Sequence, residues 1–192
     1  MSQTEIASAT GRWSCALFDR DGVLNQDVGY LNREAAWAPI AGSLEALAAL
    51  SRAGIQVGIC TNQSGIGRGL IAAREIATIH RRLRRDLHAL GTDIACLRYC
   101  PHLPDAGCGC RKPGAAMLRD ALRECGSSAD TACFVGDSLR DMQAAQAAGV
   151  EPLLVLTGNG RSDRAAAVDA GVKLVFDDCA AAVAYLLGEA SQ

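Results

Sequence analysis

Short apolar segments alternate with longer amphipathic segments along this 192-residue chain, and that alternation restricts the possible folds more than any other feature. The short segments predict strands near residues 13–18, 55–60, 94–99, 131–135, 152–156 and 173–176. The longer segments predict helices near residues 43–53, 72–90, 114–125, 139–148, 163–170 and 178–187. Strands that alternate with helices form a parallel sheet with helices on both faces. We therefore expect a three-layer α/β fold, with residues 1–192 forming one domain.

The helix expected at 72–90 carries one apolar stripe with helical spacing, formed by Ile76, Ile79, Leu83, Leu87 and Leu90. Most of its neighbouring cations fall off that stripe, which favours a solvated face over a nucleic-acid site; they are Arg81, Arg82, Arg84 and Arg85. No partner lies near His80 or His88 in the sequence, so we interpret both as ordinary helix residues.

Composition excludes several classes of partner. The net charge of -2 argues against a general binder of nucleic acid or acidic lipid, which carries a basic excess. No apolar run approaches the roughly 20 residues of a membrane span. The N-terminal sequence MSQTEIASATGRW has no charged region followed by an apolar one, so no secretion signal is expected. These features predict a cytoplasmic protein, and we expect a monomer.

Nine cysteines, an odd number, argue against a disulfide scaffold in a chain of this kind. Six of them are expected to be ordinary thiols, mostly in the core: Cys15, Cys60, Cys96, Cys125, Cys133 and Cys179. The other three lie close together with one histidine, in the pattern Cys100-x-His102-x₅-Cys108-x-Cys110. Three thiolates and an imidazole form a complete tetrahedral ligand set for Zn²⁺, with no position left for water. We therefore predict a structural zinc site in the loop 100–110.

Polar residues follow the predicted strands, and in parallel α/β sheets the chemistry lies beyond the carboxyl ends of the strands. Asp19 and Asp21 follow the first strand and, two residues apart, can face one pocket. Two such carboxylates can divide nucleophilic attack and proton transfer, and they also suit Mg²⁺. Aspartates at strand ends also serve as plain turn formers, so this pair alone is modest support.

Three more polar segments occupy equivalent places. Thr61-Asn62-Gln63-Ser64 follows the second strand in a glycine-rich turn that could bind phosphate oxygens, or could be a plain polar loop. Arg111 and Lys112 follow the third strand, just before Pro113 and a helix, and Lys112 is one of only two lysines in the chain. Asp137 follows the fourth strand and can present another carboxylate at the same sheet edge, whereas Asp141, one helical turn later, could hydrogen-bond back into the loop. Both could instead belong to the cap and the acidic first turn of a helix. Together these segments supply the groups that phosphoryl transfer requires.

In their order and in their residue sequences, the four segments resemble the motifs of the haloacid dehalogenase superfamily of phosphatases. The resemblance covers residues 13–158 and implies a Rossmann-like fold, Mg²⁺ dependence and a phosphoaspartyl intermediate. It implies that Asp19 is the nucleophile and Asp21 the proton shuttle. Thr61 and Lys112 would hold the phosphoryl group. The Mg²⁺ ligands would be Asp19, Asp21, by its main-chain carbonyl, and Asp137.

The intervals between the motifs leave no room for an inserted cap domain, so the resemblance narrows to a capless, zinc-containing branch. That branch includes heptose bisphosphate phosphatases, which make heptose precursors of lipopolysaccharide or related glycans, and histidinol phosphatases. The residues of these segments match the heptose enzymes more closely, which implies a small phosphorylated sugar as substrate. The resemblance also implies that ten residues contact the substrate: Asp27, Val28, Gly29, Tyr30, Thr61, Asn62, Gln63, Ser64, Arg111 and Lys112.

Two alternatives remain open at this point. The five-residue interval between His102 and Cys108 equally fits a histidinol-phosphate phosphatase. Ser138 stands where some heptose enzymes have a substrate-binding lysine. A catalytically idle, zinc-stabilised binding module is the alternative outside enzymes, although such modules usually lose a carboxylate and Asp19, Asp21 and Asp137 are all present.

Overall fold

A parallel six-stranded sheet forms the centre of the molecule. The computed structural model describes residues 11–189, so residues 1–10, on which most of the secretion-signal prediction rests, lie outside the described part. The strands are β1 (Cys15–Phe18), β2 (Gln56–Asn62), β3 (Cys96–Cys100), β4 (Ala132–Gly136), β5 (Glu151–Val155) and β6 (Leu174–Phe176). Their order in the sheet is β3-β2-β1-β4-β5-β6, so the order reverses beside β1.

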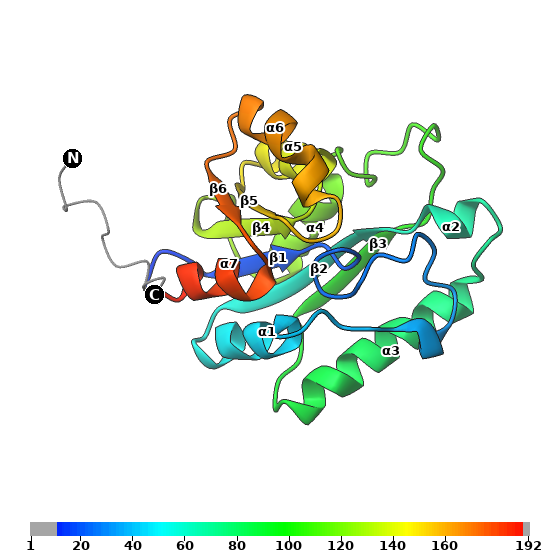
Figure 1. Cartoon of the computed structure of the whole chain (residues 1–192), viewed down its shortest axis with the longest axis horizontal. Helices are drawn as coiled ribbons and strands as arrows, with labels where there is room; N and C mark the ends of the chain where they lie inside the picture. The colour runs from blue at the N-terminus through cyan, green and yellow to red at the C-terminus, as the bar shows by residue number, and fades with distance from the viewer. Residues whose placement is uncertain (1–10, 190–192) are drawn as a thin grey trace.

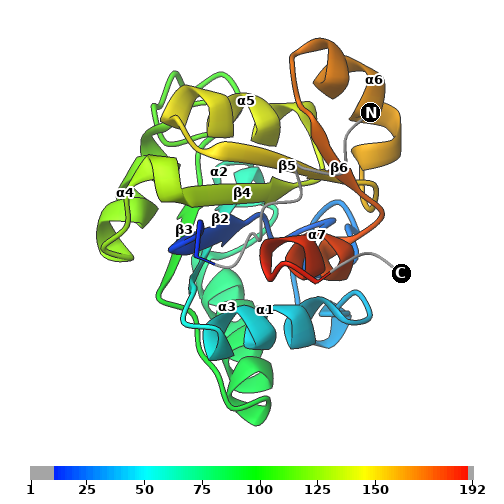
Figure 2. The same ribbon diagram turned by 90° about the vertical axis from the view of Figure 1, so that its left-hand side faces the viewer.

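Helices cover both faces of the sheet, as Figures 1 and 2 show. One face packs against α1 (Ser43–Arg52), α3 (Ala73–Ala89) and α7 (Cys179–Leu186). The other packs against α4 (Ala116–Glu124), α5 (Leu139–Ala148) and α6 (Gly160–Asp169). This arrangement confirms the predicted three-layer, Rossmann-like fold.

The strand sequences produce the two cores directly, because alternate side chains of a strand point to opposite faces. In β1, Ala16 and Phe18 join the core under α1, α3 and α7, whereas Cys15 and Leu17 join the core under α4 and α5. Aliphatic residues dominate both cores, and the cysteines of the strands are buried among them as free thiols. Only Cys125, of the six cysteines outside the zinc motif, is partly exposed.

All six predicted strands and all six predicted helices are present, with ends that differ by a few residues. Sequence reasoning missed three short elements: α2 (Ser64–Gly67) and the 3₁₀ helices η1 (Glu34–Ala36) and η2 (Ala129–Thr131). The helix predicted at 114–125 begins two residues later, at Ala116. The cause is a tight turn in which the Gly114 N–H donates to the Arg111 carbonyl at 2.7 Å.

The intervals between the strands match a capless fold. Between β1 and α1 the described chain contains only η1 and loops, and between β2 and α3 it contains only α2. Among the described residues, no helix has the length and hydrophobicity that crossing a bilayer would require.

Candidate active site and metal centre

A cavity of about 320 Å³ opens beyond the carboxyl ends of β1 and β4, where the strand order reverses. Such a switch point is where ligands bind in open α/β sheets. The lining comes from five segments of the chain: Asp19, Asp21, Asp27, Gly29, Tyr30, Thr61, Asn62, Ser64, Arg111, Lys112, Asp137, Ser138, Arg140, Asp141 and Asn159. All the residues predicted to bind substrate or Mg²⁺ line this cavity except Val28 and Gln63.

Lys112 lies at the floor of the cavity between two carboxylates. Its Nζ is 2.8 Å from Asp19 Oδ2 and 2.7 Å from Asp141 Oδ1, and its side chain is 1% exposed. Burial alone would lower the pKa of Lys112, but Asp141 and Asp19 outweigh burial and raise it. The lysine is therefore permanently cationic and holds the Asp19 carboxylate in place from one side.

The Asp19 carboxylate is held from the other side by the chain itself, since the Arg20 main-chain N–H donates to Asp19 Oδ1 at 2.7 Å. Burial raises the pKa of Asp19 to about 6, although Lys112 opposes this rise. A buried, oriented carboxylate at the edge of a cavity is suited to attack an electrophile there.

Three carboxylates converge beside Lys112. Oxygens of Asp19, Asp137 and Asp141 all lie within 4.8 Å of one another. Burial first, and then the charges of Asp19 and Asp141, raise the pKa of Asp137 to about 8. Crowded carboxylate oxygens of this kind are the hard ligands that Mg²⁺ prefers, and a bound cation would relieve their repulsion. The residues present therefore fit a Mg²⁺ ion, with Asp141 added to the predicted set.

Asp21 has a different environment. Its carboxylate accepts from Arg20 Nη2 at 2.7 and 2.9 Å, from Asn25 Nδ2 at 3.0 Å and from Gln63 Nε2 at 2.8 Å. Burial alone would raise the pKa of Asp21, but the guanidinium of Arg20 and the hydrogen bonds from Asn25 and Gln63 together outweigh burial and lower it. The side chain thus faces donors from Arg20, Asn25 and Gln63, while it still lines the cavity.

The last two residues of β2, Thr61 and Asn62, and Gln63 directly after them support the site in three ways. Asn62 fixes the main chain of Lys112: Asn62 Nδ2 donates to the Lys112 carbonyl, and the Lys112 N–H donates to Asn62 Oδ1, both at 3.1 Å. Gln63 is buried behind the cavity, where Nε2 donates to Thr61 Oγ1 at 2.9 Å as well as to Asp21. Because the Thr61 hydroxyl accepts from Gln63, its own proton is left to donate toward the cavity.

The predicted substrate-contact segment 27–30 is an exposed turn at the mouth. Asp27 Oδ1 accepts the Gly29 N–H at 2.8 Å, and Gly29 has a φ of +76°, which only glycine adopts readily. Tyr30 lines the cavity beside Gly65, whereas Val28 is 53% exposed and does not line the cavity. Of this segment, Asp27, Gly29 and Tyr30 line the cavity, and the predicted contact of Val28 with substrate stays a prediction.

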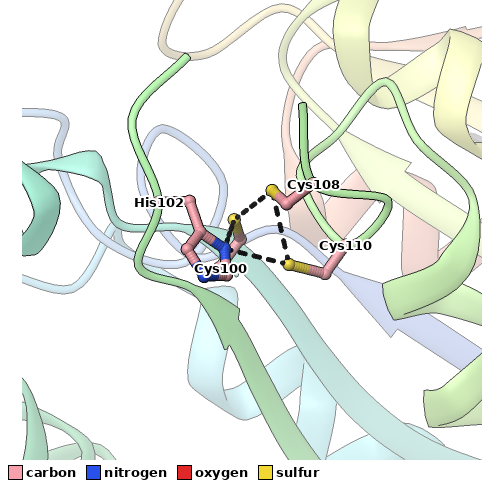
Figure 3. A group of neighbouring side chains, drawn as sticks. All are labelled: Cys100, His102, Cys108 and Cys110. Carbon is pink, nitrogen blue, oxygen red and sulfur yellow. Dashed lines mark hydrogen bonds between the residues drawn. The ribbon is translucent and has the colours of Figure 1, made fainter. Parts of the chain in front are cut away.

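The predicted zinc ligands converge, as Figure 3 shows. Cys100 Sγ is 3.6 Å from Cys108 Sγ and 3.5 Å from His102 Nδ1. Cys110 Sγ is 3.6 Å from Cys108 Sγ and 3.4 Å from His102 Nδ1. These separations are too long for disulfides, and they are close to the edges of a tetrahedron whose metal–sulfur bonds are about 2.3 Å. The four side chains therefore fit one Zn²⁺ ion.

The zinc loop is tied to the active site at both ends. Cys110 directly precedes Arg111 and Lys112. On the other side, the Gly67 N–H of α2 donates to the Pro101 carbonyl at 2.9 Å, and a side chain at Gly67 would collide with that oxygen. The loop thus joins the segment that carries Lys112 to the segment that carries Thr61 and Ser64.

Sequence reasoning missed the contribution of the fifth strand end. The Asn159 N–H and Nδ2 donate to Asp137 Oδ2 at 2.8 and 3.2 Å, and Thr157 Oγ1 donates to the Gly22 carbonyl at 2.6 Å. The rule about strand ends applies equally to Thr157-Gly158-Asn159, so the signal was present in the sequence. Arg140, in the first turn of α5, also lines the cavity and was not predicted.

A capless parallel sheet with a buried aspartate at the first strand end, opposite a lysine and a carboxylate cluster, defines a phosphatase of the haloacid dehalogenase class. In agreement, residues 109–182 match the Hydrolase_like family, described as HAD-hydrolase-like. The enzyme "D-glycero-beta-D-manno-heptose-1,7-bisphosphate 7-phosphatase" of Pseudomonas aeruginosa is 42% identical over 91% of this chain and 98% of its own. The enzyme of the same name from Bordetella bronchiseptica is 43% identical over 91% and 98%.

Solved structures agree with these sequence relatives. The crystal structure of D,D-heptose 1,7-bisphosphate phosphatase from B. bronchiseptica, complexed with magnesium and phosphate, superposes with a TM-score of 0.85. The two sequences are 41% identical, and the superposition covers 92% of this chain and 99% of the B. bronchiseptica chain. This chain belongs to the D-glycero-D-manno-heptose-1,7-bisphosphate 7-phosphatase family and is a phosphoric monoester hydrolase.

Proposed function

We propose that this protein is a Mg²⁺-dependent phosphatase that removes the C7 phosphate of D-glycero-D-manno-heptose 1,7-bisphosphate. The observation that carries the proposal is the pairing of Asp19 with Lys112 at the floor of a cavity that Arg111 also lines. One cation lies where the reacting phosphate must bind, and a second is available for the other phosphate. Relatives that are 42–43% identical carry the same activity in their names.

The reaction starts with in-line attack by a carboxylate oxygen of Asp19 on the C7 phosphorus. Arg20 lowers the pKa of Asp21 in the free protein, but the negative charge of a bound phosphate raises it again, so that Asp21 takes up a proton in the substrate complex. As the bond from phosphorus to the sugar oxygen breaks, Asp21 gives this proton to that oxygen. Asp21 then takes a proton from water while the water oxygen bonds to phosphorus and the bond to Asp19 breaks. Asp19 is restored and inorganic phosphate leaves.

The remaining groups bind and neutralise charge. Lys112 Nζ and the Thr61 hydroxyl are placed to donate to phosphoryl oxygens. Asp19, Asp137 and Asp141, with the main-chain carbonyl of Asp21, would hold Mg²⁺, which when bound supplies positive charge to the phosphoryl group. Such electrostatic stabilisation is the main requirement of phosphoryl transfer.

The substrate is distinguished by contacts outside the reacting group. The Arg111 guanidinium suits the second phosphate, because its fork of N–H donors can bind two phosphate oxygens together. Asp27 and Tyr30 at the mouth, with Asn62 and Ser64 deeper in the cavity, suit the sugar hydroxyls.

A substrate comparison tests the proposal. With Mg²⁺ present, kcat/KM is measured for the α and β anomers of heptose 1,7-bisphosphate and for histidinol phosphate, and phosphorus NMR identifies the phosphate that remains. We expect loss of the C7 phosphate and preference for the β anomer, since the relatives of 42–43% identity are named for it. A relative named for the α anomer, from Mycobacterium bovis, is 37% identical. Faster turnover of histidinol phosphate would establish the alternative enzyme, and no turnover of any ester would leave a binding module.

We further propose that the chain acts as a cytoplasmic monomer, folded as one domain, in the supply of heptose for lipopolysaccharide or related glycans. The two cores share one continuous sheet, which supports a single folded domain. Light scattering coupled to gel filtration should give the mass of one 20.0 kDa chain. A stable mass of twice that value would refute the monomer.

A further inference from the structure

Arg20, between the two motif aspartates, is fully buried and lies behind the active site. Its side chain is 0% exposed, and it does not line the cavity that Asp19 and Asp21 line. Arg20 Nη2 donates to both oxygens of Asp21, at 2.7 and 2.9 Å, and Nε donates to Oδ1 at 3.1 Å. A guanidinium that makes these parallel contacts fixes the plane of the carboxylate as well as its position.

The other end of this guanidinium contacts His80. Arg20 Nη1 lies 3.2 Å from His80 Nε2, although 60 residues separate the two in the sequence. Burial, followed by the charge of Arg20, lowers the pKa of His80 to about 3, so the imidazole is neutral at any working pH and Nε2 can accept the Nη1 proton. The ring also packs against Tyr99, with centroids 5.6 Å apart.

We propose that His80 is a positioning residue for proton transfer: through Arg20, it holds the Asp21 carboxyl group in the orientation from which its protonated form gives a proton to the leaving sugar oxygen. The inference rests on the proposed role of Asp21. A buried guanidinium that loses an acceptor is left with an unsatisfied N–H, which costs free energy. Without His80, the guanidinium gains by turning toward another acceptor, and the Asp21 carboxylate turns with it.

The leaving group provides a readout that a purely structural role would not affect. A sugar alkoxide must be protonated as it departs, whereas p-nitrophenolate leaves without a proton. Since kcat/KM reports the steps up to the departure of the leaving group, misplacing Asp21 lowers kcat/KM for the sugar phosphate selectively.

The experiment compares His80→Leu, His80→Asn and His80→Gln on heptose 1,7-bisphosphate and on p-nitrophenyl phosphate. A glutamine oxygen can reach the place of Nε2, whereas the shorter asparagine and the apolar leucine cannot supply an acceptor there. We expect His80→Leu and His80→Asn to lower kcat/KM on the bisphosphate by about 10- to 100-fold, part of the usual contribution of an acid catalyst. On p-nitrophenyl phosphate they should lower it less than about threefold, and His80→Gln should restore most of the loss.

His88→Leu is the matched control, because His88 lies on the same helix but is exposed. His88→Leu should change the activity on neither substrate.

Asp21→Asn is the reference variant and should show the same leaving-group selectivity, more strongly. If Asp21→Asn is selective but neither His80→Leu nor His80→Asn is, the positioning role of His80 is overturned. If Asp21→Asn itself lowers both activities equally, the proposed role of Asp21 fails. Equal losses on both substrates in the His80 variants, unrelieved by glutamine, would reduce His80 to a structural residue.

Discussion

At the scale of single residues, charge balance around Lys112 organises the site. The lysine neutralises Asp19 and Asp141 at once, and all three side chains are largely buried. Neither carboxylate alone would require a lysine here. The sequence indicates the role only through the rarity of lysine, since Lys112 and Lys173 are the two in the chain.

Lys112→Met should therefore damage both stability and catalysis. It leaves two buried carboxylates without their partner, which typically costs about 3–5 kcal/mol of unfolding free energy. Loss of a charge directed at the phosphoryl group should lower kcat about 100-fold or more. Urea unfolding and steady-state kinetics measure the two effects. Lys173→Met, at the exposed second lysine, is the control, and equal effects in the two variants would contradict the assignment.

His80 should make stability depend on pH in a definite direction. Its pKa is about 3 in the folded protein and near 6.5 when unfolded, so below pH 6.5 the unfolded chain binds a proton that the folded chain does not. Stability is thus lost as pH falls. Relative to His80→Gln, the free energy of unfolding of the parent should fall by about 2 kcal/mol between pH 7 and pH 5. Parallel pH profiles for the two proteins would show that the histidine is not buried as described.

At the scale of elements, loops at the strand ends do most of the positioning. The zinc loop connects β3 to the segment of Lys112, and it has no regular structure of its own between Cys100 and α4. A metal is the natural means of ordering such a loop. Its four ligands could be predicted because they are close together in the sequence.

Metal analysis of the purified protein should find about one zinc per chain. Cys108→Ser should lose that zinc, unfold at a lower temperature and lower kcat, although no zinc ligand lines the cavity. Cys125→Ser, outside the ligand set, should keep its zinc and most of its activity. Full activity in a zinc-free Cys108→Ser protein would show that the loop does not position Lys112.

The loop after β5 passes close to the Asp137 side chain and to the Gly22 main chain at Gly158. A Cβ on Gly158 would lie 2.0 Å from Asp137 Oδ2 and 2.8 Å from the Gly22 main chain. Gly158→Ala must displace Asp137, and a displacement of about 1 Å can lower kcat about 100-fold. Gly91→Ala is the matched control, because Gly91 also has a positive φ but open space around it. Measured kcat values of both variants test whether the close approach of Gly158 to Asp137 is required for activity. Similar kcat values in the two variants would show that it is not.

At the scale of the whole molecule, the sheet brings together groups that the sequence separates by up to about 140 residues. Alternation of apolar segments predicted the layers and every strand, and the rule about strand ends located Asp19, Thr61, Lys112 and Asp137. The strand order could not be predicted from the sequence, because it depends on how the segments pair in space. The contact of His80 with Arg20 could not be predicted either, because the two residues are 60 positions apart in the sequence.

The central claim is that Asp19 takes up the phosphoryl group and Asp21 completes the cycle. Asp21→Asn mixed with excess p-nitrophenyl phosphate and Mg²⁺ tests both halves together, because this leaving group needs no proton but hydrolysis of the intermediate needs a base. We expect a rapid burst of about one p-nitrophenolate per chain, then slow turnover, with mass spectrometry placing a phosphoryl group on Asp19. A phosphoryl group on any other residue would contradict the role of Asp19. Steady turnover at the rate of the parent protein, with no initial burst, would contradict the role of Asp21.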